Sequence, residues 1–548
     1  MTVPASRKPA GRPHIRIGHV VILAAVLAFL AYKLHDFTEP FAYGHARWSD
    51  AYLYWFGMMH CDLGYAATGF LNTEGITGSG ELIHYRSIGP LEGIVHSLFL
   101  CLTDGALWAV RILPLLASLA LLALLTGIQR RFRDGGNPAV LAVLLLASPF
   151  LLKYGTSDAG FWALPLTLGT AGWYLYLRFL AQGRQALLNL SILCFTLGVF
   201  ANWQAGFMGL PVFLHIALSP LPWRRKLGTL ALFAGGIALA TAIVLLHQGL
   251  VTGDYLYPFR RVLERSEGVD PTGGSIGWGE LLMLQLRRFA DYFGPVAALL
   301  AGYWFIDSAI RRTLFRDGNG WTLSFLATGL FYGFLFRNAA YIHDFLIAGF
   351  LPGFMLAAAG GADLFYRHLG KFHPRAWKGG AGAAALGLLL SAHVAIGVRS
   401  AAMFETSEAR DLTRGEASVA LYLARHLGEQ QILAADWSSG YHRTMGSDGR
   451  VYANLRPHLA YLTRRPVRFV DTPAALGALL EEAGAAGKEV VLVQLQKGPA
   501  SEVLPVPGAW IAGSHRFDQG RILTLRRGPD TPRPLTGARP ASPPHLPE

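Results

Sequence analysis

The stretch IRIGHVVILAAVLAFLAY, residues 15–32, is the first of the apolar runs that decide the fold of this 548-residue chain. A run of this length can cross about 30 Å of hydrocarbon as a helix. Similar runs recur as far as Val398, and 52% of all residues are hydrophobic while only 15% are charged. Helices must carry these runs, because lipid satisfies no backbone hydrogen bonds. The sequence therefore predicts an α-helical polytopic membrane protein.

Basic residues around the apolar runs indicate how the chain lies in the bilayer. The N-terminal segment 1–14 is basic, and further Lys and Arg clusters lie at 130–133, 178–184, 224–226, 311–312 and 367–378. Because basic loops stay on the cytoplasmic side, these connections and the N-terminus are predicted to be cytoplasmic. The first run has no obvious small-residue cleavage site, so we interpret it as an uncleaved anchor. The basic residues that orient the chain in the bilayer also explain its net charge of +13. No nucleic-acid partner is therefore predicted.

The alternate connections are then external. They are the first loop at 36–88, the short connections at 154–159, 202–203 and 337–344, the segment 249–291, and everything after Arg399. Two apolar runs, 89–103 and 106–126, lie between the external first loop and the cytoplasmic Arg130. Only an odd number of crossings can join opposite sides of the membrane, so the run 89–103 is predicted to be only partly embedded. Residues 15–399 would thus form roughly eleven spans. The Ala-, Gly- and Arg-rich composition favours a bacterial inner (plasma) membrane, with the C-terminus in the periplasm.

The pattern changes after Arg399 to that of a soluble domain. Helix-like and strand-like segments alternate between residues 400 and 527, which predicts a small periplasmic α/β domain. The Pro-rich residues 528–548 lack apolar periodicity and are predicted to be a disordered tail. The chain has only three cysteines, Cys61, Cys101 and Cys194, none in a CxxC pair, so no disulfide framework or zinc site is predicted.

The polar groups that could do chemistry gather on the external side. They are Asp50, Arg86, Asp158, Asn202 with Trp203, and His343 with Asp344. Charged groups at span ends of a helical bundle often mark a substrate path or a reaction site. Ordinary loop polarity is the alternative for each residue taken singly.

These residues also carry a family resemblance. The motifs are His45 and Trp48, Ser49-Asp50-Ala51-Tyr52 running to Leu63-Gly64, Tyr85-Arg86-Ser87-Ile88-Gly89-Pro90-Leu91, Trp108-Ala109-Val110-Arg111-Ile112, Ser148-Pro149 with Asp158, Asn202-Trp203-Gln204, and His343-Asp344-Phe345. In this order the chain resembles the membrane glycosyltransferases of the GT-C fold, in the branch of protein O-mannosyltransferases and aminoarabinose transferases. The resemblance covers roughly residues 36–400. It departs at Ser49 in the acidic doublet, at Ile88 and Gly89 before Pro90, and at Asn202.

The resemblance implies an inverting single displacement on the periplasmic face. A sugar would pass from a polyprenyl-phosphate donor, of the undecaprenyl type in bacteria, to a lipid, glycan or protein acceptor. A carboxylate with a reference pKa of about 3.9 is ionised at neutral pH and can accept the acceptor's hydroxyl proton. Asp50 is the candidate base, and the alternative is a helix N-cap or first-turn acid.

The leaving phosphate needs a cation, and arginine matches phosphate oxygens with a fork of donors. Arg86 is the first candidate, ahead of Arg337 and the pair Arg260 and Arg261, with an interfacial snorkelling role as the alternative for Arg86. Further candidates for binding the donor are Tyr85, Asp158, His45, Trp48 and His343. Asp158 could instead pair with Lys153, and the aromatic residues could form a membrane-interface belt.

No spacing in the sequence demands a metal, although a histidine joining carboxylates at a divalent cation stays open. Two other functions also stay open: a transporter or lipid flippase, and a non-catalytic protein whose outer domain binds a partner. Transporters often contain paired repeats and broken helices near the bilayer midplane. Here no repeat is seen and the polar groups gather at one end, which favours the transferase.

Overall fold

A computed structural model describes the chain between residues 14 and 526. The segments outside the described part are 1–13, 36, 39–44, 78–79, 133–136, 159–160, 219–221, 267, 269–274, 316, 373–379, 410–414, 437–442, 446–450, 454–457, 496–502, 518–519 and 527–548. The predicted disordered tail lies outside the described residues. The chain divides into two compact units, one of residues 1–72 and 85–411 and one of residues 73–84 and 412–548.

The first unit is a helical bundle. Five of its described helical segments are long and apolar enough to cross a membrane: α1 (His14–Leu34), α4 (Ala109–Phe132), α10 (Trp223–Thr252), η1 (Asp344–Phe350) with α16 (Leu351–Phe372), and α18 (Ala381–Ala409). A sixth candidate is the bent pair α12 (Trp278–Phe293) and α13 (Pro295–Ile310), whose axes differ by 115°. Gly294 turns the chain between them with a φ of +84°, a conformation that favours glycine. A polytopic helical protein is thereby confirmed.

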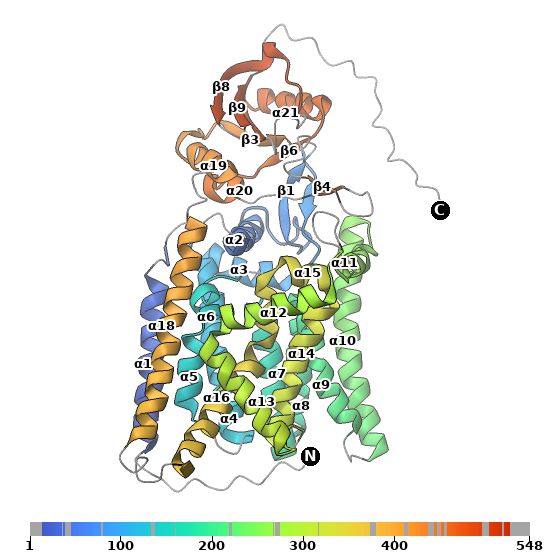
Figure 1. Cartoon of the computed structure of the whole chain (residues 1–548). Coiled ribbons are helices and arrows are strands. Elements are labelled where there is room, and N and C mark those ends of the chain that lie inside the picture. The colour runs from blue at the N-terminus through green and yellow to red at the C-terminus, as the bar shows by residue number, and fades with distance from the viewer. Residues whose placement is uncertain are drawn as a thin grey trace. The chain divides into compact units, whose positions relative to one another are not determined.

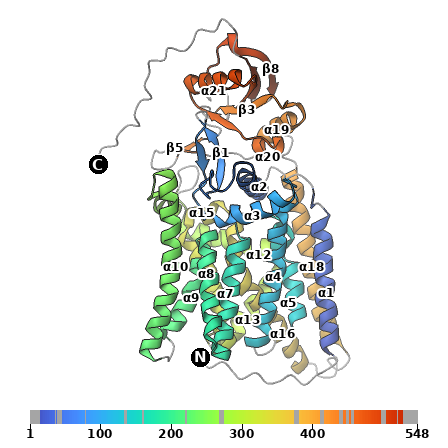
Figure 2. The ribbon, with the colours of Figure 1, turned by 180° about the vertical axis from the view of Figure 1, so that it is seen from behind.

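Burial separates central from peripheral helices. The apolar window of η1 and α16 is 94% buried, whereas those of α1, α10 and α18 are 11–17% buried. The outer helices expose side chains such as Leu23, Leu239 and Leu388. A helix that exposes leucines over its length is suited to contact with lipid. α1 and α18 lie at one edge of this unit, and α10 at the other (Figures 1 and 2).

The other upright helices complete the bundle. They are α5 (Pro138–Leu146), α6 (Pro149–Tyr154), α7 (Ala163–Gln182), α8 (Gln185–Ala201), α9 (Gln204–Leu218) and α14 (Asp317–Leu335). Their interior is filled by large rings, including Trp173 packed on Phe325 at 4.1 Å between ring centroids. The number of spans stays a prediction, because several of these helices are shorter than a full crossing.

Short helices lie at one end of the bundle (Figure 1). They are α2 (His45–Leu63), α3 (Leu91–Leu102), α11 (Tyr257–Ser266) and α15 (Arg337–Ile342). A disulfide joins Cys61 of α2 to Cys101 of α3, so the prediction of no disulfide is wrong. The cysteines are 40 residues apart in sequence, and only the packing of α2 against α3 reveals that they meet.

The second unit is built on a seven-stranded mixed sheet. Its strand order is β2-β1-β6-β3-β7-β9-β8. The strands are β1 (Thr73–Thr77), β2 (Leu82–His84), β3 (Gln431–Asp436), β6 (Arg468–Val470), β7 (Glu489–Leu495), β8 (Ile511–Phe517) and β9 (Gly520–Leu525). Helices α19 (Gly415–His426), α20 (His458–Thr463) and α21 (Pro473–Ala485) and the hairpin of β4 (Arg443–Met445) and β5 (Val451–Ala453) belong to the same unit.

The sheet includes a piece of the first loop. β1 runs parallel to β6, with Ile76 opposite Arg468 and Thr77 opposite Phe469, and β2 pairs with β1 as a hairpin. The division at residue 400 that we expected from the sequence therefore leaves out two strands of the C-terminal unit. Because a hydrogen-bonded sheet cannot be divided by a bilayer, the first loop and the C-terminal residues lie on the same side of the membrane.

Candidate functional site

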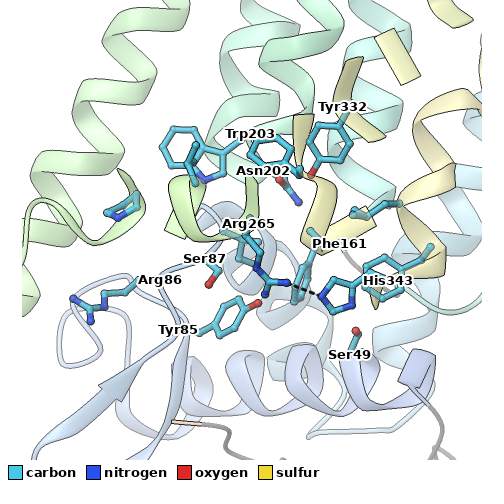
Figure 3. Close-up of a pocket in the computed structure, with 17 residues that line it drawn as sticks. Ser49, Tyr85, Arg86, Ser87, Phe161, Asn202, Trp203, Arg265, Tyr332 and His343 are labelled. Atoms are coloured by element: carbon cyan, nitrogen blue, oxygen red, sulfur yellow. Dashed lines mark hydrogen bonds between the residues drawn. The ribbon is translucent and has the colours of Figure 1, made fainter. Parts of the chain in front are cut away.

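A pocket of about 940 Å³, counting the part open to solvent, lies where the short helices meet the connections of the bundle (Figure 3). Ser49 of α2, residues 85–88 before α3, Phe161 before α7 and Asn202 with Trp203 between α8 and α9 line one part of it. The other lining residues are Pro258, Val262 and Arg265 of α11, Tyr332 and Phe336 around the end of α14, Ala339 of α15, and His343, Phe345 and Leu346 beyond it. Segments far apart in sequence therefore form one site.

Arg265 and His343 form the polar centre of this pocket. The Arg265 Nη1 donates to Nε2 of His343 at 3.0 Å, as the dashed line in Figure 3 marks. A guanidinium only donates hydrogen bonds, so Nε2 of His343 is the acceptor in this contact. The ring of His343 also stacks on Phe345 with centroids 4.9 Å apart. The predicted role of His343 in binding the donor is consistent with its position in the pocket wall.

Sequence reasoning missed Arg265. Pro258, Val262 and Arg265 are spaced four and three residues apart, so a helix from Tyr257 places them on one face. All three line the pocket. Interpreting this loop as a helix would have added Arg265 to the candidate arginines.

Arg86 lies at the edge of the pocket and points away from Arg265 (Figure 3). Its Nη1 lies 3.1 Å from Oγ1 of Thr252 and 3.4 Å from Oδ2 of Asp254, and its guanidinium stacks on Tyr257 at 3.9 Å. Arg260 pairs with the same aspartate. These contacts fix the guanidinium of Arg86 against Thr252, Asp254 and Tyr257. Arg86, the first candidate for binding phosphate, is therefore not at the centre of the pocket.

The other predicted donor-binding residues are distributed differently. Tyr85 lines the pocket, and its ring packs on Phe161 at 5.9 Å. The Arg337 guanidinium stacks on Trp278 at 4.7 Å, and Arg337 is not among the described lining residues. His45 and Trp48 lie in the first turn of α2, but their side chains are outside the described part.

Phe161 enters the pocket from a strained turn. Its φ of +58° lies in the left-handed region, which is uncommon for a residue with a side chain. Its N–H donates to the carbonyl of Asp158, which closes the turn. Such backbone strain tends to occur at functional sites.

Asp50 and Asp158 lie together but are fully buried. The backbone N–H of Asp158 donates to Oδ1 of Asp50 at 2.8 Å. Among the residues that the structure describes, neither carboxylate lines the pocket. Ser49, which precedes Asp50, and Phe161, three residues after Asp158, do line it. Since α2 begins at His45, Asp50 is beyond the first turn, and the alternative of an N-cap or first-turn acid is wrong.

Asp158 does not pair with Lys153. Lys153 instead lies 3.6 Å from Asp344, so the ion pair that we considered for Asp158 is not formed. Asp158 accepts a hydrogen bond from the N–H of Ala163 at 2.9 Å through Oδ1. Its Oδ2 lies 3.4 Å from Nε2 of His96.

Glu92 completes a buried group with His96 and Asp158. Its side chain has no exposed surface, and within the described part of the chain neither of its carboxylate oxygens has a hydrogen-bond partner. Burial and then the nearby Asp158 carboxylate raise the pKa of Glu92 well above its usual value. The three residues offer ligand atoms that all lie within 4.8 Å of one another, an arrangement that the sequence spacing did not show.

The structure also explains one departure from the family motif. Gly89 stands where relatives have the first of two prolines, and its N–H donates to the carbonyl of Ala201 at 3.0 Å. A Cβ at this position would lie 1.9 Å from the carbonyl oxygen of Phe200. Proline would lose the hydrogen bond and collide with α8, so the close approach of these backbones requires glycine.

Comparisons with known proteins agree with this architecture. A sequence model described as dolichyl-phosphate-mannose-protein mannosyltransferase matches residues 88–247. A search of curated proteins gives no significant match. Among solved structures, ArnT from Cupriavidus metallidurans bound to undecaprenyl phosphate has a TM-score of 0.57 and 13% identity, covering 94% of this chain and 98% of that one. The archaeal oligosaccharyltransferase AglB from Archaeoglobus fulgidus, in complex with an inhibitory peptide and a dolichol-phosphate, has a TM-score of 0.53 and 11% identity, covering 88% of this chain and 70% of that one.

At such identities the structural similarity shows the fold. It extends over nearly the whole of this chain and of ArnT, and the family match falls inside the bundle that forms the pocket. The chain therefore has the GT-C fold of membrane glycosyltransferases and, over residues 88–247, matches the protein mannosyltransferase family, as the resemblance in its motifs predicted.

Proposed function

We propose that the protein is a glycosyltransferase that transfers a sugar from a polyprenyl-phosphate donor to an acceptor outside the cytoplasm. The observation that carries this proposal is the pocket around Arg265 and His343, at the end of a bundle with the GT-C fold. Its position at one end argues against the transporter or flippase alternative, which favours a site near the midplane.

Arg265 is the proposed ligand of the donor phosphate. A guanidinium binds phosphate oxygens through two parallel, charge-assisted hydrogen bonds, and the surrounding aromatic rings limit competition from water. The rings of Tyr85, Trp203 and Tyr332 offer faces on which a sugar can stack. The polyprenyl tail would follow the exposed leucines of α10, such as Leu246 and Leu250, into the lipid.

Asp50 is the proposed general base. The acceptor oxygen attacks C1 of the sugar, the bond from C1 to the phosphate oxygen breaks with its electrons on the phosphate, and the acceptor proton passes to Asp50. Attack opposite the leaving group inverts the anomeric carbon. The carboxylate is covered in this structure, so the mechanism requires the wall formed by Ser49 and Phe161 to open when the acceptor binds.

The proposed location is the bacterial inner membrane, with the pocket facing the periplasm. The disulfide between Cys61 and Cys101 supports an oxidising compartment for this end of the bundle. The first loop and the C-terminal unit share one sheet, so both lie on the same side of the membrane. This agrees with the proposed orientation, in which the N-terminus is cytoplasmic and both of these segments are periplasmic.

Asp50→Asn tests the role of the base. Purified protein is mixed with membranes that supply acceptors and with a panel of radiolabelled undecaprenyl-phosphate sugars, and transfer of label out of the donor is measured. We expect Asp50→Asn to lower the rate by about 10²- to 10⁴-fold, the usual contribution of a general base. Asp307→Asn is the control, because Asp307 pairs with Arg311 at the end of α13. An unchanged rate in Asp50→Asn would remove this residue as the base, whereas wild type that uses none of the donors would contradict the proposed function.

A further inference from the structure

The group formed by Glu92, His96 and Asp158 is built like a cation site. Glu92 and His96 are four residues apart in α3, which places them on one face of the helix. Asp158 reaches them from the connection between α6 and α7, with Oδ2 3.4 Å from Nε2 of His96. All three side chains are fully buried, and their ligand atoms lie within 4.8 Å of one another.

The hydrogen-bonding of Glu92 points independently to a missing partner. Among described residues, nothing donates a hydrogen bond to Oε1 or Oε2, although the side chain is fully buried. A buried polar group without a partner costs free energy, and a buried charge costs more. Protonating Glu92 would remove its charge but supply no donor to its other oxygen. A cation among the three side chains would bind both carboxylates and the imidazole at once.

We propose that Glu92, His96 and Asp158 bind one divalent transition-metal ion, with Zn²⁺ the best match. Zinc binds imidazole nitrogen and carboxylate oxygen at about 2.0–2.2 Å, so tetrahedral neighbours lie roughly 3.3–3.6 Å apart. The 3.4 Å between Nε2 of His96 and Oδ2 of Asp158, which is also a hydrogen-bond distance, falls in this range, and all three ligand atoms lie within 4.8 Å of one another. Two carboxylates balance the charge of the ion. An imidazole ligand disfavours Mg²⁺ and Ca²⁺, which prefer oxygen.

The ion would position other groups rather than react. None of its three ligands is among the described residues that line the pocket. The other oxygen of Asp158 holds the start of α7 at Ala163, and the N–H of Asp158 holds Asp50. A metal on Oδ2 would therefore fix the segment between α6 and α7 to α3. The site stands on its own geometry and holds whether or not the protein transfers sugars.

Zinc binding to the full-length protein tests the inference. Protein purified in detergent without a histidine tag is stripped with EDTA, equilibrated with Zn²⁺ alone and freed of loose metal by gel filtration. Bound zinc is measured by mass spectrometry, and thermal unfolding is followed with Zn²⁺ or with EDTA. Glu92→Gln and, separately, His96→Gln remove one ligand each. Glu280→Gln is the matched control, because Glu280 is a glutamate of α12 that accepts a hydrogen bond from Tyr341 and is not part of the proposed site.

We expect ~1 tightly bound zinc per chain in wild type and in Glu280→Gln, unaffected by excess Mg²⁺. Zinc should raise the Tm of both by roughly 5 °C over EDTA. Either ligand variant should lose the bound zinc and this rise. Wild type without bound zinc would overturn the inference even if both variants failed to fold. Equal zinc binding by wild type and the folded ligand variants would overturn it as well.

Discussion

The position of Arg265 on α11 places this arginine among the residues that line the pocket. Arg86 and Arg260 both contact Asp254, whereas Arg265 contacts His343 inside the pocket. The guanidinium of Arg265 lies among the residues that line the pocket, and that of Arg86 points away from Arg265. The proposed donor should therefore depend more on Arg265 than on Arg86.

Arg265→Gln should weaken binding of undecaprenyl phosphate by about 10- to 100-fold, because a hydrogen bond to a charged group contributes roughly 1.5–3 kcal/mol. The measurement is a lipid titration of purified protein by native mass spectrometry. Arg311→Gln removes an arginine that is paired with Asp307 and serves as the control. If both variants bind the lipid like wild type, Arg265 is not the phosphate ligand.

Gly89→Ala should destabilise the bundle. The added methyl group would lie 1.9 Å from the carbonyl oxygen of Phe200, so α3 or α8 has to move. We expect a loss of roughly 1–3 kcal/mol, typical of overpacking, visible as a lower Tm in detergent and a lower yield. Gly228→Ala meets nothing within 4 Å and is the control. Equal Tm values for the two variants would contradict the prediction, because they would show that the backbone near Phe200 can move to accept the methyl group without a loss of stability.

At the scale of elements, α2 and α3 form a covalently joined pair at the mouth of the bundle. α2 carries Asp50 and Ser49, and α3 carries Glu92 and His96. The bond between Cys61 and Cys101 limits how far these helices can separate.

Cys101→Ser should lower the free energy of unfolding by about 2–4 kcal/mol, the usual effect of losing a native disulfide. Thermal unfolding in detergent measures it, and a reducing agent should bring wild type to the same Tm. Cys194→Ser is the control, since Cys194 is a free cysteine. A wild-type Tm that does not respond to reduction would speak against the disulfide.

The sequence was most informative about elements that are decided by long apolar runs. It predicted the polytopic helical fold and the family resemblance, whereas the extracytoplasmic position of Asp50, Arg86 and Asp158 stays a prediction. It could not predict contacts made by residues distant in the chain. The disulfide, the pair of Arg265 with His343, and the group around Glu92 all depend on how short helices pack at the bundle end.

At the scale of the whole molecule, the shared sheet links the first loop to the C-terminal unit. β1 and β6 belong to one sheet although the bundle sequence lies between them. This topology requires an even number of crossings between residues 84 and 412. The eleven-span prediction satisfies this condition, because ten crossings would follow the first.

Cysteine labelling tests this topology and its direction. In Cys194→Ser protein, Glu81→Cys and Glu429→Cys should both react with a membrane-impermeant maleimide in cells whose outer membrane is permeabilised. Both positions are exposed in the second unit. Gln185→Cys, at the start of α8, should react only after lysis, since we predict the connection from α7 to α8 to be cytoplasmic. Before lysis, labelling of only one of the first two positions in the permeabilised cells would contradict the shared sheet.

The pairing of β1 with β6 also sets an order of events during synthesis. Thr77 and Arg468 are 391 residues apart, so at roughly 5–20 residues per second the hairpin of β1 and β2 leaves the ribosome on the order of 20–80 s before its partner strand. During that interval it presents an unpaired strand edge, a site of aggregation or capture by chaperones. A chain that stalls before its last helix inserts can never complete the sheet. The exposed hairpin would then mark an unfinished protein for the proteases of the cell envelope.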